Sequence, residues 1–266
     1  MVKNQIQKEL RLIIWKRRWQ QFTKYAAVFA LLITSVFGIY SLFETSDTKQ
    51  MITANVKPGS KSEIILPDAT KVQLNGATTI TYNVNNAKER LVQLSGEAFF
   101  DVVKNPDCPF RVIANDLQIE VVGTSFNVSA YQDSESTSTT LVEGSVAVST
   151  ANGAERTITP SERLAYNKKS HQLSVEKVDT ELYTSWINGV YIFKNMPLEE
   201  ILEKLSRWYD FSVTYQDETL KHTRFSLTAD RKTDIDKLLE VINYTSDVKL
   251  EKQGKSINVK KQRRIQ

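Results

Sequence analysis

The residues best suited to acid–base chemistry are Glu97 and Asp101, two carboxylates that lie four positions apart. Paired carboxylates carry out glycoside hydrolysis, in which one acts as an acid and the other as a base or nucleophile. Here the pair flanks Phe99 and Phe100 in a segment with strand character, and no catalytic base accompanies it. We therefore expect Glu97 and Asp101 to cap the strand or to form salt bridges.

Other chemistry-bearing residues are scarce. Pro58-Gly59-Ser60-Lys61-Ser62 only partly resembles a phosphate loop, because the G-x-x-x-x-G-K-[ST] spacing is missing. Cys108 is the only cysteine, and His171 and His222 are the only histidines, which excludes an intramolecular disulfide and the usual Cys/His zinc site. The sequence therefore predicts a protein that is not an enzyme, with no catalytic, metal or cofactor-binding residues.

The basic residues gather at the start of the chain. The whole sequence holds 35 Lys and Arg against 31 Asp and Glu, which gives a formal net charge of +4. Seven of the basic residues and one acid, Glu9, precede residue 26, so the remainder of the chain is slightly acidic. A basic surface for nucleic acid is not predicted, and we expect no direct contact with DNA or RNA.

An uncharged apolar run over residues 25–43 predicts a transmembrane helix. From Ala26 to Phe43 it contains no charge and no proline, and at about 1.5 Å per residue it spans ~27 Å, close to the thickness of a bilayer's hydrocarbon core. The positive-inside rule places residues 1–24 in the cytoplasm and the bulk of the chain outside. The alternative is a cleaved signal peptide, although the exit sequence offers no clear cleavage site of small residues.

Residues 1–24 form a short basic segment with an apolar stripe at helical spacing. A partner's groove could bury that stripe while the Lys and Arg side chains meet an acidic protein surface. The alternative is a juxtamembrane helix on anionic lipid, where each basic residue contributes ~1 kcal/mol. Both interpretations stay open, and the candidate contacts with a partner or with lipid are Ile6, Leu10, Ile13, Ile14, Trp15, Arg17 and Arg18.

The region after the span divides into a tether and an all-β domain. Residues 44–61 are polar and weakly patterned, which predicts a tether. Over residues 62–182, short β-branched or alternating segments recur about every ten residues, separated by turn signals. This spacing predicts an all-β fold built as a sandwich, a roll or a short solenoid.

The pattern changes over residues 183–262, which predict a small α+β domain. Thr233 and Asp236 resemble a variant capping box ahead of the second of two helices. The flanking strand candidates give the order β-α-β-β-α-β-β, with both helices on one face of a sheet. The first helix follows Pro197, and its apolar face consists of Leu198, Ile201, Leu202, Leu205 and Trp208.

Aromatic side chains are concentrated in this C-terminal region, and most of them are expected in its core. An edge strand or an exposed aromatic could instead pair with the signalling domain of another protein by strand addition. The candidates for such a contact are Trp186, Phe193, Trp208 and Tyr209.

Five motifs follow one another through the β region. They contain Leu66, Pro67, Asp68 and Thr70; Gly96, Glu97, Phe99 and Phe100; Pro109 and Phe110; Gly123, Thr124, Phe126, Asn127 and Val128; and Glu143 and Gly144. In order and spacing they resemble the FecR family of periplasmic regulatory domains. We expect these residues to be mainly structural, with the three glycines providing positive φ or close backbone approach.

The resemblance implies a single-pass regulator of the anti-sigma type in the bacterial inner membrane. It implies that the signalling domain of an outer-membrane TonB-dependent transducer contacts the periplasmic part, and that the cytoplasmic segment controls an extracytoplasmic-function (ECF) sigma factor. The segment from Trp186 to Leu198 resembles the domain that follows FecR domains in Bacteroidetes-type members, whose order of elements is similar to the secretin and TonB short domain. Family members usually have more than 24 residues before the span, so either the true start lies upstream of Met1 or one helix acts alone.

The alternative function is a membrane-anchored protein that binds a carbohydrate or another ligand outside the cytoplasm. An exposed aromatic platform on the β domain would favour it, and the sequence offers no clear candidate for one. An envelope enzyme ranks third, because no nucleophile, base and orienting residue occur together.

Overall fold

The structure, a computed structural model, describes residues 31–39, 50–84 and 90–262. Residues 31–39 are helical and cover part of the span predicted over 25–43. Within the described ranges, no helix is long and apolar enough to cross a membrane. The predicted basic helix 1–24, with all of its candidate contact residues, lies outside the described residues. Residues Lys49–Gln266 form one compact unit, separate from Met1–Thr48.

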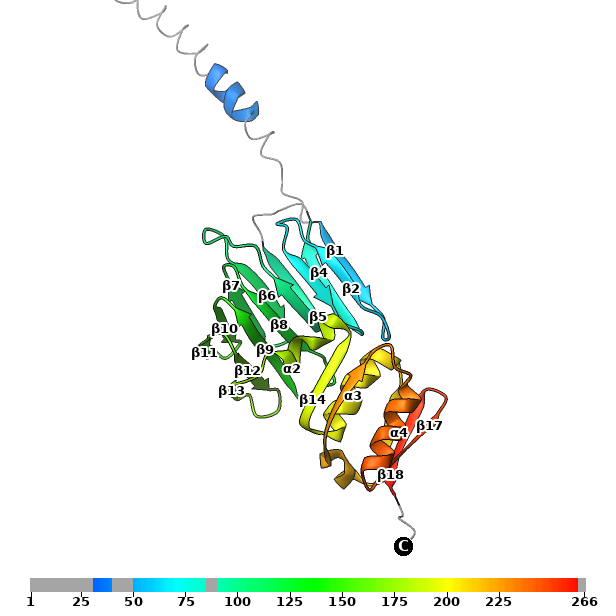
Figure 1. The fold of residues 1–266 in the computed structure, drawn as a ribbon. Helices are drawn as coiled ribbons and strands as arrows, with labels where there is room; N and C mark the ends of the chain where they lie inside the picture. The colour runs from blue at the N-terminus through cyan, green and yellow to red at the C-terminus, as the bar shows by residue number, and fades with distance from the viewer. Residues whose placement is uncertain (1–30, 40–49, 85–89, 263–266) are drawn as a thin grey trace, which may run out of the picture. The chain divides into compact units, whose positions relative to one another are not determined.

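The first part of the compact unit, residues 51–177, is called the β lobe (Figure 1). Its strands belong to two sheets that share strand β5, in the orders β1-β4-β5-β6-β7-β10-β11 and β2-β3-β5-β8-β9-β12-β13. The strands are β1 (Met51–Val56), β2 (Ser62–Ile65), β3 (Lys71–Leu74), β4 (Thr78–Asn83), β5 (Leu91–Asp101), β6 (Phe110–Ala114), β7 (Leu117–Val121), β8 (Ser125–Ala130), β9 (Ser136–Glu143), β10 (Val146–Thr150), β11 (Glu155–Ile158), β12 (Glu162–Asn167) and β13 (Leu173–Lys177).

Strand β5 changes sheets at Gly96. Up to Ser95 it pairs with β4 and β6, and from Gly96 onward it pairs with β8 and then also with β3. Gly96 has φ +114°, and a Cβ at this position would lie 2.5 Å from Thr78 Oγ1. Only glycine allows this backbone conformation and this close approach, so the motif glycine creates the point at which the two sheets join.

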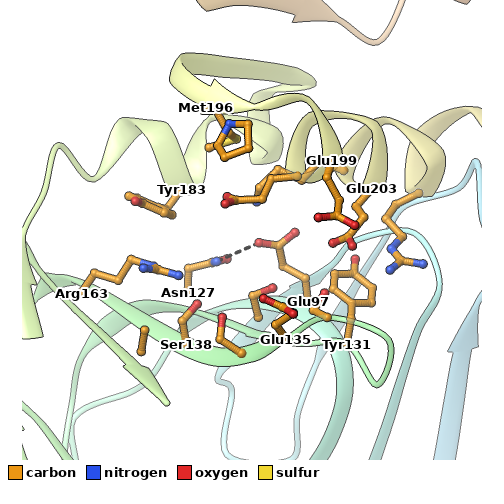
Figure 2. A pocket seen from close by; sticks show the side chains of 18 of the residues that line it. Glu97, Asn127, Tyr131, Glu135, Ser138, Arg163, Tyr183, Met196, Glu199 and Glu203 are labelled. Carbon is orange, nitrogen blue, oxygen red and sulfur yellow. Dashed lines mark hydrogen bonds between the residues drawn. The ribbon is translucent and has the colours of Figure 1, made fainter. Parts of the chain in front are cut away.

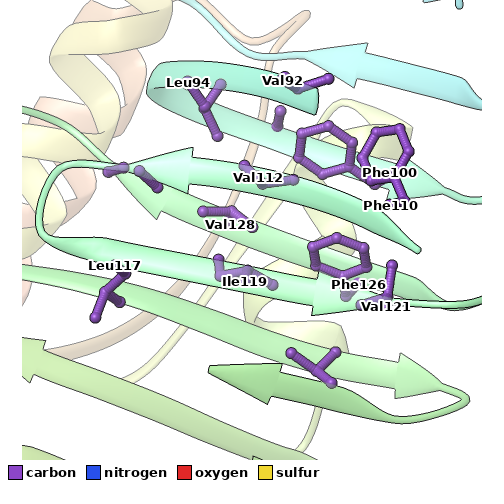
Figure 3. Close-up of a cluster of buried hydrophobic side chains, with 14 of the residues drawn as sticks. Val92, Leu94, Phe100, Phe110, Val112, Leu117, Ile119, Val121, Phe126 and Val128 are labelled. Atoms are coloured by element: carbon purple, nitrogen blue, oxygen red, sulfur yellow. The ribbon is translucent and has the colours of Figure 1, made fainter. Parts of the chain in front are cut away.

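One hydrophobic core occupies the space between the two sheets (Figure 3). Alternation along β7 directs Leu117, Ile119 and Val121 inward, as expected for strands with one solvent-facing side. The Phe100 ring stacks on Phe126 at 5.2 Å between centroids and meets Phe110 of the other sheet at 5.9 Å. The all-β prediction is therefore confirmed, and the shared core matches its sandwich alternative.

Residues 190–261 are called the C-terminal lobe, which has a hydrophobic core of its own. The predicted order β-α-β-β-α-β-β is confirmed, and the apolar stripe of the first helix is buried as expected. A short connection of α2 (Glu181–Thr184) and a 3₁₀ turn, η1 (Ser185–Asn188), precedes the lobe. Its elements are β14 (Val190–Pro197), α3 (Leu198–Tyr209), β15 (Ser212–Tyr215), the 3₁₀ turn η2 (Glu218–His222), β16 (Arg224–Asp230), α4 (Ile235–Thr245), β17 (Val248–Gln253) and β18 (Ser256–Lys261).

Three details of the prediction are wrong. The single sheet of the C-terminal lobe is split into a β14–β16 pair and a β15–β18–β17 sheet. Helix α4 is capped by Asp234, whose side chain accepts a hydrogen bond from the Asp236 backbone N–H at 2.9 Å, whereas Thr233 belongs to the preceding turn. The predicted tether contains β1, because an edge strand that buries few side chains leaves a weak apolar pattern.

Candidate functional site at the junction of the two lobes

The end of helix α3 docks against the β lobe. The helix follows Pro197, whose fixed φ suits a helix start, and ends at Asp210 in the left-handed conformation. Trp208 is the last residue of its apolar stripe, and its ring stacks on Tyr191 at 3.9 Å. The indole Nε1–H donates to Asn75 Oδ1 at 3.1 Å. Packing within the C-terminal lobe thus directs one polar atom of Trp208 at the β lobe.

Glu97 lies at the centre of this junction. It follows Gly96, the residue at which β5 changes sheets, and only 3% of its surface is exposed. Its Oε1 accepts from Asn127 Nδ2 at 3.0 Å (Figure 2), and its Oε2 accepts from Asn75 Nδ2 at 2.7 Å. Among the described residues no ion pair involves Glu97, so the salt bridge, one of the two alternatives predicted for it, is not formed. Two amides hold this buried carboxylate instead.

The two asparagines connect Glu97 to aromatic residues beyond the β lobe. Asn75 Nδ2 also donates to the Tyr191 hydroxyl at 2.8 Å, while Asn127 Oδ1 accepts from Trp186 Nε1 at 3.1 Å. An amide side chain both donates and accepts, so one group can satisfy a carboxylate on one side and an indole N–H on the other. We call Asn75, Glu97, Asn127, Trp186, Tyr191 and Trp208 the Glu97 network.

The network is shielded from water. Burial, and after it the charge of Glu97, raises the pKa of Tyr191 well above its ordinary value, so that this hydroxyl stays protonated. A buried polar group is costly unless it is hydrogen-bonded, and here each carboxylate oxygen has a donor. The network can therefore hold the two lobes in one geometry, and loss of any member leaves a partner unsatisfied.

Close backbone packing adds to the junction. A Cβ on Gly76 would lie 2.3 Å from the Arg207 carbonyl oxygen, so only glycine fits where α3 meets the β3–β4 turn. The Arg207 guanidinium lies 4.4 Å from the Tyr131 ring centre and binds both carboxylate oxygens of Asp133 at 2.6 Å. Tyr131 in turn donates to the Gly76 carbonyl at 2.9 Å.

A polar cleft of about 410 Å³ opens beside the network (Figure 2). Its floor carries Glu97, Asn127 and Ser138 from the β lobe, and Glu199 and Glu203 face it from α3. Burial raises the pKa of Glu203 to about 7, with the negative charge of Asp133 and neighbouring glutamates adding to the effect and Arg207 opposing it. The cleft has no nucleophile and base in contact, and within the described residues no cluster of three metal-ligating side chains occurs.

Three of the four residues proposed for transducer contact are buried. Trp186, Phe193 and Trp208 are 1–4% exposed and belong to the junction or the C-terminal core. Tyr209 is partly buried, and its hydroxyl donates to the Thr233 carbonyl at 2.8 Å. The prediction of direct contact is therefore wrong for the three buried side chains in this conformation, because their rings and N–H groups are already used inside the molecule.

The family-motif residues have structural roles at most positions. Asp68 accepts from Thr70 N and Oγ1 and pairs with Arg90 Nε at 2.7 Å. The prediction for the glycines is confirmed, since Gly144 has φ +97° and a Cβ on Gly123 would lie 2.7 Å from Lys104. Asp101 accepts from Ser125 Oγ at 3.0 Å, which ties two strand ends together. Buried apolar motif residues are Leu66, Phe100, Phe110, Phe126 and Val128.

The sequence did not predict the roles of Arg90 and Asn75, which bind the motif residues Asp68 and Glu97. Arg90 is 6% exposed and donates to the carbonyls of Val103 and Cys108 as well as to Asp68. Asn75 is fully buried. A polar residue at the end of an apolar strand, next to a glycine, was the available signal for Asn75; nothing local pointed to Arg90.

Comparisons with known proteins agree with this architecture. The family model described as FecR protein matches residues 52–147, and the model described as FecR, C-terminal matches residues 190–259. Two crystal structures from Parabacteroides distasonis ATCC 8503, at 1.65 and 2.50 Å resolution, contain a protein described there as a candidate anti-sigma factor. Each is 26% identical, has a TM-score of 0.74, and aligns over 80% of this chain and 100% of its own. No protein of curated function matches the sequence.

The two matched regions correspond to the two lobes, and the Glu97 network joins them. Together they account for well over half of the chain, and they occur in the order that the sequence motifs predicted. The chain belongs to the FecR family.

Proposed function

We propose that the chain is a membrane-anchored regulator of the anti-sigma type. Its two lobes receive a signal from a TonB-dependent outer-membrane transducer, and its basic N-terminal segment acts on an ECF sigma factor across a single inner-membrane span. The protein performs no catalysis in this proposal. The alternative of a carbohydrate-binding protein is weaker, because no aromatic side chain among the described residues of the β lobe is exposed.

One observation supports this function most directly. The FecR region and the FecR C-terminal region are joined through a buried hydrogen-bonded network, and that network contains no reactive constellation. A buried network that couples the β lobe to the C-terminal lobe suits a protein that relays a signal better than it suits an enzyme. The likeness to the candidate anti-sigma factor over 80% of the chain adds the partner class to the proposal.

The experiment is a pull-down from membranes with the full chain as bait and detection of sigma factors by mass spectrometry. One variant carries Ile6→Asp and Leu10→Asp, which place charges on the predicted apolar stripe. Its matched control carries Asn4→Asp and Gln5→Asp, which add the same charge away from the stripe. We expect the first variant to lose an ECF sigma factor that both the parent chain and the control retain.

Two outcomes would contradict the proposal. Failure of the parent chain to retain any sigma factor overturns the anti-sigma function. Equal loss with both variants shows that net charge, and not the stripe, mediates the contact. The predicted orientation has a separate readout, because externally added protease should digest residues 50–262 in spheroplasts while residues 1–24 stay protected.

A further inference from the structure

Strand β1 links the folded unit to the N-terminal segment and is weakly held. It is the first described strand after residues 1–48, and it pairs with β4 alone, at the edge of its sheet. Of its six residues only Val56 is buried and Ala54 partly so. Strands with few buried apolar contacts belong to the least stable parts of a fold, so β1 is poised to separate from β4.

The loop that follows β1 is held by the C-terminal half of the chain. Residues 57–61 lie between β1 and β2, and β2 is the edge strand of the other sheet. The Gly59 N–H donates to the Arg207 carbonyl at 2.8 Å, and Arg231 Nη2 donates to the Gly59 carbonyl. Lys61 Nζ donates to the Ile187 carbonyl at 2.9 Å.

These contacts come from three separate places beyond the β lobe. Arg207 is at the end of α3, Arg231 follows β16, and Ile187 is in η1. The Arg231 guanidinium also lies 5.9 Å from the Trp208 ring centre, so the same arginine contacts both the loop and the Glu97 network. Gly59 has φ +78°, which fixes the loop in a conformation that glycine adopts without strain.

We propose that loop 57–61 is a latch through which the docking of the C-terminal lobe controls the pairing of β1 with β4. With the lobe docked, the loop is fixed and β1 stays in its sheet. When a partner draws the lobe away, the loop is released, β1 separates, and the chain between the β lobe and the N-terminal segment lengthens. This mechanism rests on the proposed relay function, for which it supplies the mechanical step.

The strand order favours transmission of lobe movement through loop 57–61 over transmission through the core between the two sheets. The Glu97 network reaches the second sheet at β5 and β8, two central strands whose inward side chains belong to a fully buried core. Such a core transmits motion only by repacking. The latch, in contrast, joins the C-terminal lobe directly to two edge strands, where a small displacement breaks few apolar contacts.

Hydrogen–deuterium exchange of the full chain tests the latch without any sigma factor or transducer, so its failure is distinguishable from failure of the proposed function. The first variant combines Lys61→Ala with Arg231→Ala, which removes both side-chain contacts of the latch. We expect exchange of the β1 amides to accelerate by about tenfold or more, while amides of β6 and β7 in the same lobe exchange at the parent rate.

The second variant, Trp208→Phe, loosens lobe docking at a side chain that forms no bond with the loop. It should also accelerate exchange in β1, by a smaller factor. The matched control is Arg111→Ala, which removes a surface ion pair to Glu120 between β6 and β7 and should leave β1 unchanged.

The latch proposal is overturned if the β1 amides exchange at the parent rate in both the Lys61→Ala, Arg231→Ala variant and the Trp208→Phe variant. Faster exchange throughout the β lobe also overturns it, because that result indicates global destabilisation without a specific path to β1. If the double variant does not fold, Arg231→Lys serves in its place, because it retains the charge and loses the guanidinium geometry. Parent-like β1 exchange in both Arg231→Lys and Trp208→Phe then counts against the proposal.

Discussion

The β-lobe core and the lobe junction are held together in different ways. The core is a continuous cluster of apolar side chains, with Phe100, Phe110 and Phe126 at its centre. The junction is built around a buried carboxylate and two amides. Apolar contacts are non-directional and tolerate volume-conserving changes, whereas a buried polar network works only if every donor and acceptor is matched. The core therefore supplies stability, and the junction specifies one docking geometry.

The largest effect is expected in the core. Phe100 is fully buried and contacts an aromatic ring from each sheet, so Phe100→Ala should cost about 3–5 kcal/mol in the free energy of unfolding. Urea denaturation of the full chain provides the measurement. Val175→Ala, at a side chain that is 43% exposed, is the control and should change stability by less than about 0.5 kcal/mol. A similar cost for both would refute the assignment of Phe100 to the core.

The next effect concerns the Glu97 network. Asn75→Ala leaves one carboxylate oxygen, the Trp208 N–H and the Tyr191 hydroxyl without their amide partner, and we expect a loss of about 2–4 kcal/mol. Trp208→Phe removes the indole N–H together with part of a buried ring that stacks on Tyr191, and should cost about 1–3 kcal/mol.

A double-mutant cycle sharpens this prediction. If Asn75 and Trp208 interact as described, the double variant should be destabilised by less than the sum of the single variants, with a coupling of about 0.5–3 kcal/mol. Additive effects would show that the two side chains act independently. Phe100→Ala combined with Trp208→Phe serves as the reference pair, since no hydrogen bond or ring contact joins these residues in the described structure.

A smaller effect is expected at the rim of the junction. Arg207 binds Asp133, whose side chain is 63% exposed, and stacks on Tyr131. Arg207→Lys retains the charge but loses the planar guanidinium over the Tyr131 ring, and should cost about 0.5–1 kcal/mol. Lys169→Ala breaks the fully solvated pair with Glu135 and should cause no measurable change in the same denaturation experiment. Equal effects of the two variants would argue against a role of Arg207 in docking.

The smallest effect is a pH dependence at the cleft. The folded-state pKa of Glu203 is raised from 4.5 to about 7, so the folded protein binds more protons than the unfolded chain between these values. The contribution of this carboxyl to stability is thus fully present below pH 4.5 and is lost as the pH rises through 7. We therefore expect Glu203→Gln to raise the free energy of unfolding above that of the parent chain by more at pH 8 than at pH 5. Parallel stability curves from pH 5 to 8 would contradict the assignment.

Much of the fold was predictable because burial leaves a periodic trace. The alternation in β7 and the helical stripe from Leu198 to Trp208 indicated buried faces, and both are observed. Strand β1 was missed because an edge strand buries little, and the cap of α4 was misplaced by one residue because Thr233 and Asp234 are both good capping residues. The aromatics of the C-terminal region were expected mainly in its core, and Trp186, Phe193 and Trp208 are buried. The alternative of direct contact through these side chains is wrong because composition does not distinguish a buried ring from an exposed one.

The sequence by itself determined the order of the elements, the family motifs and the special backbone roles of the three motif glycines. Only the tertiary structure decided that Glu97 joins two lobes, because its partners Asn75 and Asn127 lie on other strands and the aromatics that complete the network lie beyond residue 185. Hydrogen bonds between residues so distant in sequence have no period and no local signature. They exist only once the two hydrophobic cores have formed and brought their polar edges together.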